Sequence, residues 1–362
     1  MNGTVIDILG IVTAILLIIF SGFTLSYKKG NIQSHKFLSA FLLVNAIYII
    51  DFLLPVIGET FNINLNPISG FGFYFAFLFG PLLYIYSRSL TTKDFVFRPV
   101  HLFHFLLFII AFIVRILSIR LPFIYIYVIL QLQTTIYMAA CFIVILQYRN
   151  EIKKYFSSID KLNLTWMLYV VGAFFIMWMI DLCTYFLSTL NMIDRTAELY
   201  LVFLSLFINF VFATLIFYKA LLHPEIFSGI LKTESAQKYE QSKLSDEEKK
   251  EYLNRLENYF TREKPFLNPS LTISNVASDL QISSKYISQI INETLHKNFY
   301  DYINSYRIKE AKKLLSGNRD QGKTVLEILY DSGFNSKSAF NTAFKKHTGT
   351  TPTSYRKQKI TA

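Results

Sequence analysis

The sequence contains little charge and almost no cysteine. Only 17% of its 362 residues are charged, whereas about 25% is usual for a soluble domain. Cys141 and Cys183 are its two cysteines, which are too few for a disulfide framework, and neither lies in a Cys-x-x-Cys pair. Patterns for a serine nucleophile, a zinc protease or a phosphate-binding loop are also missing. We therefore expect no enzyme, no catalytic residue, no cofactor and no metal.

Apolar and basic residues are abundant, and they lie in different parts of the chain. Hydrophobic residues make up 52% of the chain, and this high content excludes intrinsic disorder. The net charge is +11. Residues 1–220 carry a net +5, residues 221–270 carry −1, and residues 271–362 carry +7. We therefore predict three parts, an apolar domain over residues 1–220, a linker with one helix over 221–264, and a basic domain over 265–362.

The apolar part contains seven runs, most of them long enough to cross a bilayer as a helix, which takes about 20 residues. A signal peptide is not expected, because the first run lacks a basic segment before it and a small-residue cleavage site after it. The sequence thus predicts a bundle of seven membrane helices in contact with lipid, at Val5–Leu25, Phe37–Ile57, Phe71–Leu90, Leu102–Leu117, Phe123–Gln147, Leu164–Leu187 and Ala197–Tyr218.

Basic residues in the connections between these runs predict the orientation, because basic loops stay on the cytoplasmic side. The alternate connections hold only Arg120 and Arg195, with Arg115 at a helix end. This asymmetry places the N-terminus outside the bacterial cytoplasmic membrane and everything after Tyr218 in the cytoplasm. The three basic connections contain Lys28, Lys29, Lys36, Arg88, Lys93, Arg98, Arg149, Lys153, Lys154 and Lys161.

Three ionisable residues lie inside the predicted membrane helices, where charge is costly and suggests a function. Asp51, Arg115 and Asp181 all fall late in even-numbered runs and therefore at similar depth in the outer half of the membrane. One interpretation is an outward-facing pocket that binds a small-molecule signal. The alternative is a structural salt bridge, or an Arg115 that extends to the interface.

His101 and His104 begin the fourth run and share a helix face, as metal-ligand pairs do. Because no third ligand stands beside them, we interpret them as a hydrogen-bonded pair at the interface.

The linker contains one predicted helix. The stretch from Pro224 to Lys243 is polar and indicates a connector. Ser245 with Glu248 three residues later forms a capping box, and apolar residues then recur at helical spacing up to Pro265. The apolar face of this helix could cover the last domain, pair with a second copy, or belong to a solvated spacer; we favour packing or dimerisation.

The basic domain repeats one design. A short helix over Leu271–Leu280, a turn and a second helix over Ser284–Leu295 are followed by Phe299–Leu315, a longer helix. The same helix-turn-helix pattern then returns, ending in a helix over Ser336–His347. In this geometry the second helix enters the DNA major groove. Two such units in a domain of net charge +7 predict an all-α DNA-binding domain.

Turn, core and end signals of this domain follow one another in a specific order. They are formed by Ser283, Tyr286, Ile287, Ser288, Phe299, Tyr302, Ile303, Arg307, Ile308, Ala311, Leu314, Leu315, Gly333, Phe334, Ser338, Phe340, Phe344, Lys345, Lys346, Gly349, Pro352, Tyr355 and Arg356. Through these residues the stretch Leu271–Arg356 resembles the AraC/XylS family of transcriptional regulators. Two positions depart from the family pattern: Ile291 stands where Phe is usual, and His296 where Gly is usual, in a turn that we expect to be left-handed.

The membrane part is similar to seven-helix modules fused to such domains in bacteria, through residues 80–86 and through His101, His104 and Phe105. This similarity implies a membrane-bound one-component regulator and names no ligand.

Removing the inward-facing residues from each second helix leaves the candidate DNA contacts. Gln and Asn can bond adenine and Lys can reach guanine, and by the family pattern Lys285, Ser288 and Gln289 match base-reading positions. Lys337 and Lys345 could contact phosphate alone, which positions the protein without specifying a sequence. The full set is Lys285, Ser288, Gln289, Asn292, Lys337, Ser338, Asn341, Thr342 and Lys345.

Together these patterns predict a receptor and transcription factor in one polypeptide, with promoter DNA as its partner and a homodimer left open. We expect a signal to reach DNA through the seventh membrane helix and the helix over Ser245–Arg262. Two alternatives stay open, namely an anchor whose regulator is released by cleavage between Pro224 and Lys243, and a membrane transporter or enzyme with a DNA-binding tail.

Overall fold

A computed structural model describes residues 3–27, 31–65, 68–92, 95–159, 164–222, 244–316 and 323–360. In these ranges every regular element is a helix, and β-type pairing is limited to one antiparallel bridge between Phe156 and Thr272. The all-α prediction is confirmed there. The predicted connector from Pro224 to Lys243 lies outside the described residues, as do Lys28, Lys29, Lys93 and Lys161. The chain divides into two compact units, Met1–Leu146 with Leu164–Leu231, and Gln147–Asn163 with Lys232–Ala362.

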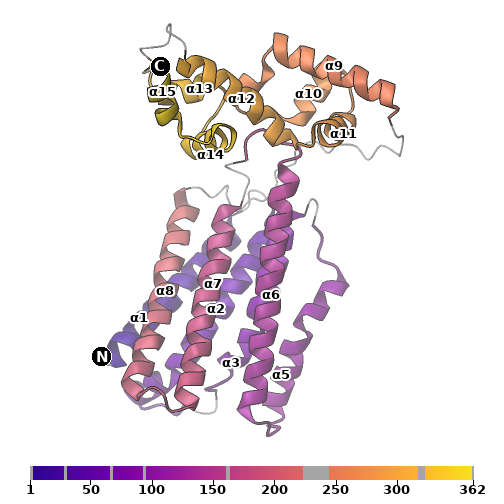
Figure 1. The fold of residues 1–362 in the computed structure, drawn as a ribbon. Coiled ribbons are helices and arrows are strands. Elements are labelled where there is room, and N and C mark those ends of the chain that lie inside the picture. Colours follow the sequence, from indigo (N-terminus) through magenta and orange to yellow (C-terminus); the bar gives the residue numbers. More distant parts are fainter. Residues whose placement is uncertain are drawn as a thin grey trace. The chain divides into compact units, whose positions relative to one another are not determined.

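The first unit is a bundle of long helices (Figure 1). In it, α1 packs on α2 and α8, α7 packs on α8, and α2 packs on α4. Many side chains on the outside are apolar, such as Ile8 and Ile136, which are 58% and 65% exposed. The elements are α1 (Gly3–Ser26), α2 (Ile32–Phe61), α3 (Gly72–Phe75), η1 (Ala76–Leu78), α4 (Phe79–Thr91), η2 (Pro99–Phe105), α5 (Leu106–Ile116), α6 (Phe123–Ile152), α7 (Thr165–Thr189) and α8 (Arg195–Leu222).

Six helical segments of the described chain are long and apolar enough to cross a membrane, where the sequence predicts seven. The run predicted over Phe71–Leu90 differs from expectation, because it consists of α3, a 3-10 turn η1 and the 13-residue α4. The other six predicted runs each correspond to one of the six segments, with η2 and α5 together forming the shortest, Pro99–Ile116.

Pro81 offers a physical reason for this interruption. Proline has no backbone N–H, so in a continuous helix the carbonyl four residues earlier loses its donor. That carbonyl belongs to Phe77, the middle residue of η1, and Gln133 of α6 donates its side-chain amide to it at 3.1 Å. Both Phe77 and Gln133 are buried. A side chain from another helix thus provides the hydrogen bond that Pro81 cannot.

The second unit contains the predicted helix-turn-helix pairs and two separate apolar cores. The first core contains Phe299, Tyr302 and Ile303, and the second contains Ile308 and Ala311. All five residues lie on one helix, so the longer helix between the pairs serves both cores (Figure 1). The elements are α9 (Asp246–Arg262), η4 (Pro265–Leu267), α10 (Ile273–Leu280), α11 (Ser284–Leu295), α12 (Phe299–Ser316), α13 (Val325–Asp331), α14 (Lys337–Thr348) and α15 (Pro352–Ile360).

Helix α9 begins at the predicted capping box and packs within the chain. The Ser245 side chain accepts from the Glu248 backbone N–H, and the Glu248 carboxylate accepts from the Ser245 N–H at 2.8 Å. Leu256 and Phe260 of α9 are buried in the first core. The packing that we expected for this apolar face is therefore found, against α10 and α11.

The end of α11 has the left-handed turn expected at His296. Its φ is 50° and its ψ is 37°, and its side chain is exposed. Glycine adopts this conformation at little cost, whereas other residues are strained by it. The helix ends where the sequence predicts, at a modest cost in stability.

Candidate nucleic-acid interface

Each helix-turn-helix unit holds its second helix by a side-chain cap at the N-terminus. The Ser283 hydroxyl accepts from the Lys285 N–H at 3.3 Å at the start of α11. The Ser336 hydroxyl accepts from the Ala339 N–H at 3.1 Å at the start of α14. Such caps satisfy backbone donors that lack a partner within the helix. They fix where each second helix begins.

The turn of the second unit requires its glycine. Gly333 has a φ of 87°, and a Cβ placed on it would lie 2.4 Å from the Phe266 carbonyl oxygen. Ser332, Gly333 and Phe334 are all buried. The turn before α14 therefore packs directly on the segment that precedes α10, which joins the two helix-turn-helix units closely.

On α11 the predicted DNA-contacting residues lie opposite the core. Ile287, Ile290 and Ile291 are each 1% exposed and form the inner face. The outer face presents four side chains that are exposed or half-buried, namely Lys285, Ser288, Gln289 and Asn292.

On α14 the same division holds. Phe340, Ala343 and Phe344 are buried in the second core. All five predicted contacts on this helix have exposed side chains, namely Lys337, Ser338, Asn341, Thr342 and Lys345. The nine predicted residues thus lie on two polar faces, one for each unit.

One predicted base-reading residue has a partner that the sequence analysis missed. Gln289 donates its side-chain amide to the Glu293 carboxylate at 3.1 Å, and the Lys249 ammonium of α9 lies 3.1 Å from the same carboxylate. The Lys249 ammonium, followed by the Gln289 amide, holds the pKa of Glu293 below its usual range. The four-residue spacing from Gln289 to Glu293 could have indicated the first contact, whereas nothing in the sequence points to the second.

Other carboxylates of this unit are paired with cations. The Lys346 ammonium of α14 lies 2.7 Å from the Asp301 carboxylate of α12, and the Lys264 ammonium lies 3.1 Å from the Glu310 carboxylate. By contrast Lys285, Lys337 and Lys345, on the predicted faces, make no ion pair in the part of the chain that the structure describes. Their charge is therefore available to a phosphate backbone.

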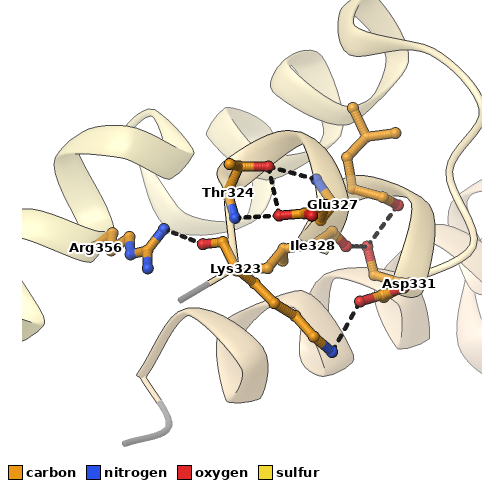
Figure 2. Close-up of polar contacts among 8 residues, drawn as sticks. Lys323, Thr324, Glu327, Ile328, Asp331 and Arg356 are labelled. Atoms are coloured by element: carbon orange, nitrogen blue, oxygen red, sulfur yellow. Dashed lines mark hydrogen bonds and ion pairs between the residues drawn. The ribbon is translucent and has the colours of Figure 1, made fainter. Parts of the chain in front are cut away.

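The start of α13 is held by a polar network (Figure 2). The Thr324 hydroxyl accepts from the Glu327 N–H at 3.1 Å, and the Glu327 carboxylate accepts from the Thr324 N–H at 2.6 Å. The Lys323 ammonium lies 3.0 Å from the Asp331 carboxylate at the other end of the helix. The Arg356 guanidinium donates to the Lys323 carbonyl oxygen at 2.6 Å. These contacts tie α15 to α13, the helix that precedes the second turn.

In the bundle of long helices the three predicted pocket residues form no ion pair with one another. The Gly70 N–H donates to the Asp51 carboxylate at 2.9 Å, and Arg115 donates to the neighbouring Ser69 carbonyl oxygen at 3.3 Å. Asp51 and Arg115 therefore hold the same turn. The Arg115 guanidinium also lies over the Phe71 ring, 4.4 Å from its centre.

Asp181 lies between two helices of the same unit. It accepts from the Tyr127 hydroxyl at 3.1 Å and from the Gln131 amide at 3.0 Å, so α6 and α7 are joined by a polar contact. The structure thus brings two of the three predicted residues to one turn and gives the third its own partners.

The two histidines at the start of the fourth run are hydrogen-bonded, as expected. The Arg98 N–H donates to the His101 Nδ1 at 2.8 Å, and the His104 Nδ1 lies 2.8 Å from the Tyr137 hydroxyl. Both imidazoles line a cavity of about 200 Å³ together with Arg88. Among the described residues no group of three or more metal-ligating side chains occurs.

Comparison with known proteins gives a family match within the basic domain. Residues 276–358 match a family described as "Helix-turn-helix domain". Over 88 residues the chain is 34% identical to the melibiose operon regulatory protein of Escherichia coli, a match that covers 24% of this chain and 28% of that protein. It is also 29% identical over 89 residues to the Msm operon regulatory protein of Streptococcus mutans, covering 25% of this chain and 31% of that protein. No solved structure matches.

A shorter relative is covered more fully. The chain is 28% identical over 89 residues to a probable transcription factor PqrA of Proteus vulgaris, covering 25% of this chain and 70% of that protein. The C-terminal part is therefore a helix-turn-helix domain similar to those of transcriptional regulators.

Proposed function

We propose that this protein is a membrane-bound transcriptional regulator that binds promoter DNA through both helix-turn-helix units. The single observation that carries the proposal is the pair of polar faces on α11 and α14, built on two cores that share α12. The residue types on these faces are those that read base edges and neutralise phosphates. A helix shared by both cores can hold the units about one helical turn of DNA apart.

The relatives support regulation of transcription, because they are named as regulators of operons or as transcription factors. None of these names describes an enzyme. The matches span less than a third of the first relatives' length. The signal that each relative responds to and the operon that it regulates are therefore not assigned to this chain.

The test is DNA occupancy by the full-length chain in lipid nanodiscs. Lys285, Gln289 and Asn341 are each changed to Ala, and we expect each variant to lose affinity by about 1–3 kcal/mol if a base contact is removed. A variant that removes a phosphate contact, such as Lys337→Ala, weakens binding to all sequences and lowers the salt dependence. Unchanged occupancy and salt dependence in all four variants would contradict the assignment.

We also propose that the first unit spans the bacterial cytoplasmic membrane with the N-terminus outside. Six apolar helical segments support insertion into a membrane, and basic residues in alternate connections support the orientation. Reporter fusions test it: a periplasmic phosphatase fused at the N-terminus should be active, and one fused after α15 should be inactive. The opposite pattern would contradict the orientation, because it would place the DNA-binding domain outside the cytoplasm.

The proposed sensing role rests on the polar residues of the membrane unit. Asp51 and Arg115 bind adjacent backbone groups of one turn, and Asp181 joins α6 to α7. A signal that competes for these contacts would change the packing of the bundle, and it can shift the protein only as far as its affinities for the two states differ. If these residues sense the signal, Asp51→Asn and Asp181→Asn abolish the response of a reporter gene without lowering protein level.

A further inference from the structure

Arg307 is a cation buried between the two helix-turn-helix units. It lies on α12, after Ile303 of the first core and before Ile308 of the second, and it is 1% exposed. Burial lowers the pKa of Arg307 to about 10, so it remains charged at neutral pH. A buried charge is costly unless hydrogen bonds satisfy it.

Four hydrogen bonds satisfy this guanidinium, and every acceptor is neutral. The Nε donates to the Phe266 carbonyl oxygen at 2.8 Å, and one terminal nitrogen donates to the Asn268 carbonyl oxygen at 2.9 Å. The other two acceptors belong to Ser157, namely its carbonyl oxygen at 2.9 Å and its hydroxyl at 3.1 Å. Half of the bonds of the buried charge are therefore made to the connection between α6 and α7.

This connection also completes the starts of two helices. The first backbone N–H groups of a helix have no acceptor within it. Ile273, the first residue of α10, donates to the Tyr155 carbonyl oxygen at 2.9 Å, and Tyr300, the second residue of α12, donates to the Lys153 carbonyl oxygen at 3.0 Å. The connection thus supplies acceptors that neither helix has of its own.

The same segment reaches the second helix-turn-helix unit. The Ser158 hydroxyl donates to the Asn335 side-chain oxygen at 3.1 Å, in the turn before α14. Ser157 is 1% exposed, and both its N–H and its hydroxyl donate to the Leu271 carbonyl oxygen, at 3.1 and 2.6 Å. Within six residues, from Lys153 to Ser158, the segment contacts the first helix-turn-helix unit, the shared helix α12 and the second helix-turn-helix unit.

We infer that Lys153–Ser158 is a positioning segment of the DNA-binding domain, which fixes the two helix-turn-helix units relative to each other through the contact of Ser157 with Arg307. This inference rests on the proposed function. The segment follows α6 directly in the chain. A displacement of the end of that helix would therefore move the hydrogen-bond acceptors that the two helix-turn-helix units share. The route differs from the one expected through the last membrane helix and α9.

Hydrogen–deuterium exchange of the full-length chain in nanodiscs tests the docking without DNA. The amides of Ile273 and Tyr300 are the reporters, because their acceptors lie in the segment, and fragmentation to single residues resolves them. Ser157→Ala removes the hydroxyl that bonds both Arg307 and the Leu271 carbonyl oxygen. It should speed exchange at both reporters by about tenfold, the effect of losing a hydrogen bond to a charged group. Lys154→Ala is the matched control, because the Lys154 ammonium pairs with the Glu151 carboxylate at the end of α6 and not with the helix-turn-helix units. Rates in the Ser157→Ala variant equal to those of wild type, or unprotected reporters in wild type, would overturn the inference.

A DNA experiment separates this inference from the proposed function. A site is selected by the wild-type chain from random DNA, and one base pair is then inserted between its two half-sites. Wild type should lose about tenfold in affinity on insertion, while the Ser157→Ala, Ser158→Ala double variant loses about twofold, as expected if the three hydrogen bonds of these two hydroxyls fix the spacing. Equal losses in wild type and the double variant would overturn the positioning role. Failure to select any site would instead overturn the proposed function, and the exchange result would stand.

Discussion

The Lys249 ammonium of α9 lies 3.1 Å from the Glu293 carboxylate of α11, which also accepts from Gln289. A carboxylate that is bonded to a predicted DNA contact is thereby neutralised by a helix that precedes the two helix-turn-helix units. The ion pair is partly exposed, so its value lies in the electrostatic potential near DNA more than in stability.

Lys249→Ala should therefore weaken DNA binding, because it leaves an unpaired negative charge beside Gln289. We expect a loss of about threefold at moderate salt, larger at low salt. Fluorescence anisotropy with the full-length chain measures it, and Lys250→Ala is the control, because Lys250 is exposed and makes no ion pair in the described chain. Equal losses in both variants would show that only net charge matters.

His296→Gly should stabilise the DNA-binding domain. Removing the side chain relieves a left-handed conformation with a φ of 50° and gains about 1 kcal/mol. A glycine at Thr294, which is exposed two residues earlier within α11, should instead destabilise the helix by a few tenths of a kcal/mol. Exchange rates of α11 amides measure both changes, and a loss of protection in His296→Gly would refute the strain.

Gln133→Leu should destabilise the bundle of long helices, because it removes the donor that replaces the missing N–H of Pro81. The expected loss is about 1 kcal/mol. In a chain that also carries Pro81→Ala, residue 81 again has an N–H for the Phe77 oxygen, so the loss should shrink. A double-mutant cycle measures this coupling, from the thermal unfolding in detergent of the wild type, both single variants and the double variant. Additive effects would mean that the two residues act independently.

The pH dependence of α13 follows from Glu327. Hydrogen bonds from the Thr324 N–H and hydroxyl hold the pKa of Glu327 below its ordinary value of 4.5. Its folded pKa is lower than its unfolded one, so the contribution to stability is complete above about pH 4.5 and is lost as the pH falls through the native pKa. Exchange of α13 amides should show this loss in wild type and not in Glu327→Gln. An identical acid profile in both chains would argue against the capping box.

Much of the DNA-binding domain could be predicted from the sequence because its signals are local. The Ser245–Glu248 capping box, the apolar spacing of α11 and α14, and the left-handed His296 each depend on residues within one or two turns of helix. Binary patterning then separates the inner from the outer residues of each second helix, which is how the nine candidate contacts were chosen.

The rest depends on contacts between residues distant in the sequence. The apolar pattern over Phe71–Leu90 indicates one membrane helix, and only the Phe77–Gln133 contact shows why three short elements replace it. The docking of Ser157 on Arg307, which joins residues 150 positions apart, has no periodicity or motif behind it. The basic residues near Ser157 indicated a cytoplasmic loop, a signal that says nothing of packing.

The most direct test of the account is a selection of DNA by the full-length protein in a membrane. Nanodiscs carrying the wild-type chain and nanodiscs carrying the Lys285→Ala, Asn341→Ala variant are incubated with random DNA, and bound sequences are read out after several rounds. Wild type should enrich two half-sites about one helical turn apart, and the variant should enrich neither. No enriched sequence, or the same sequence enriched by both proteins, would contradict it.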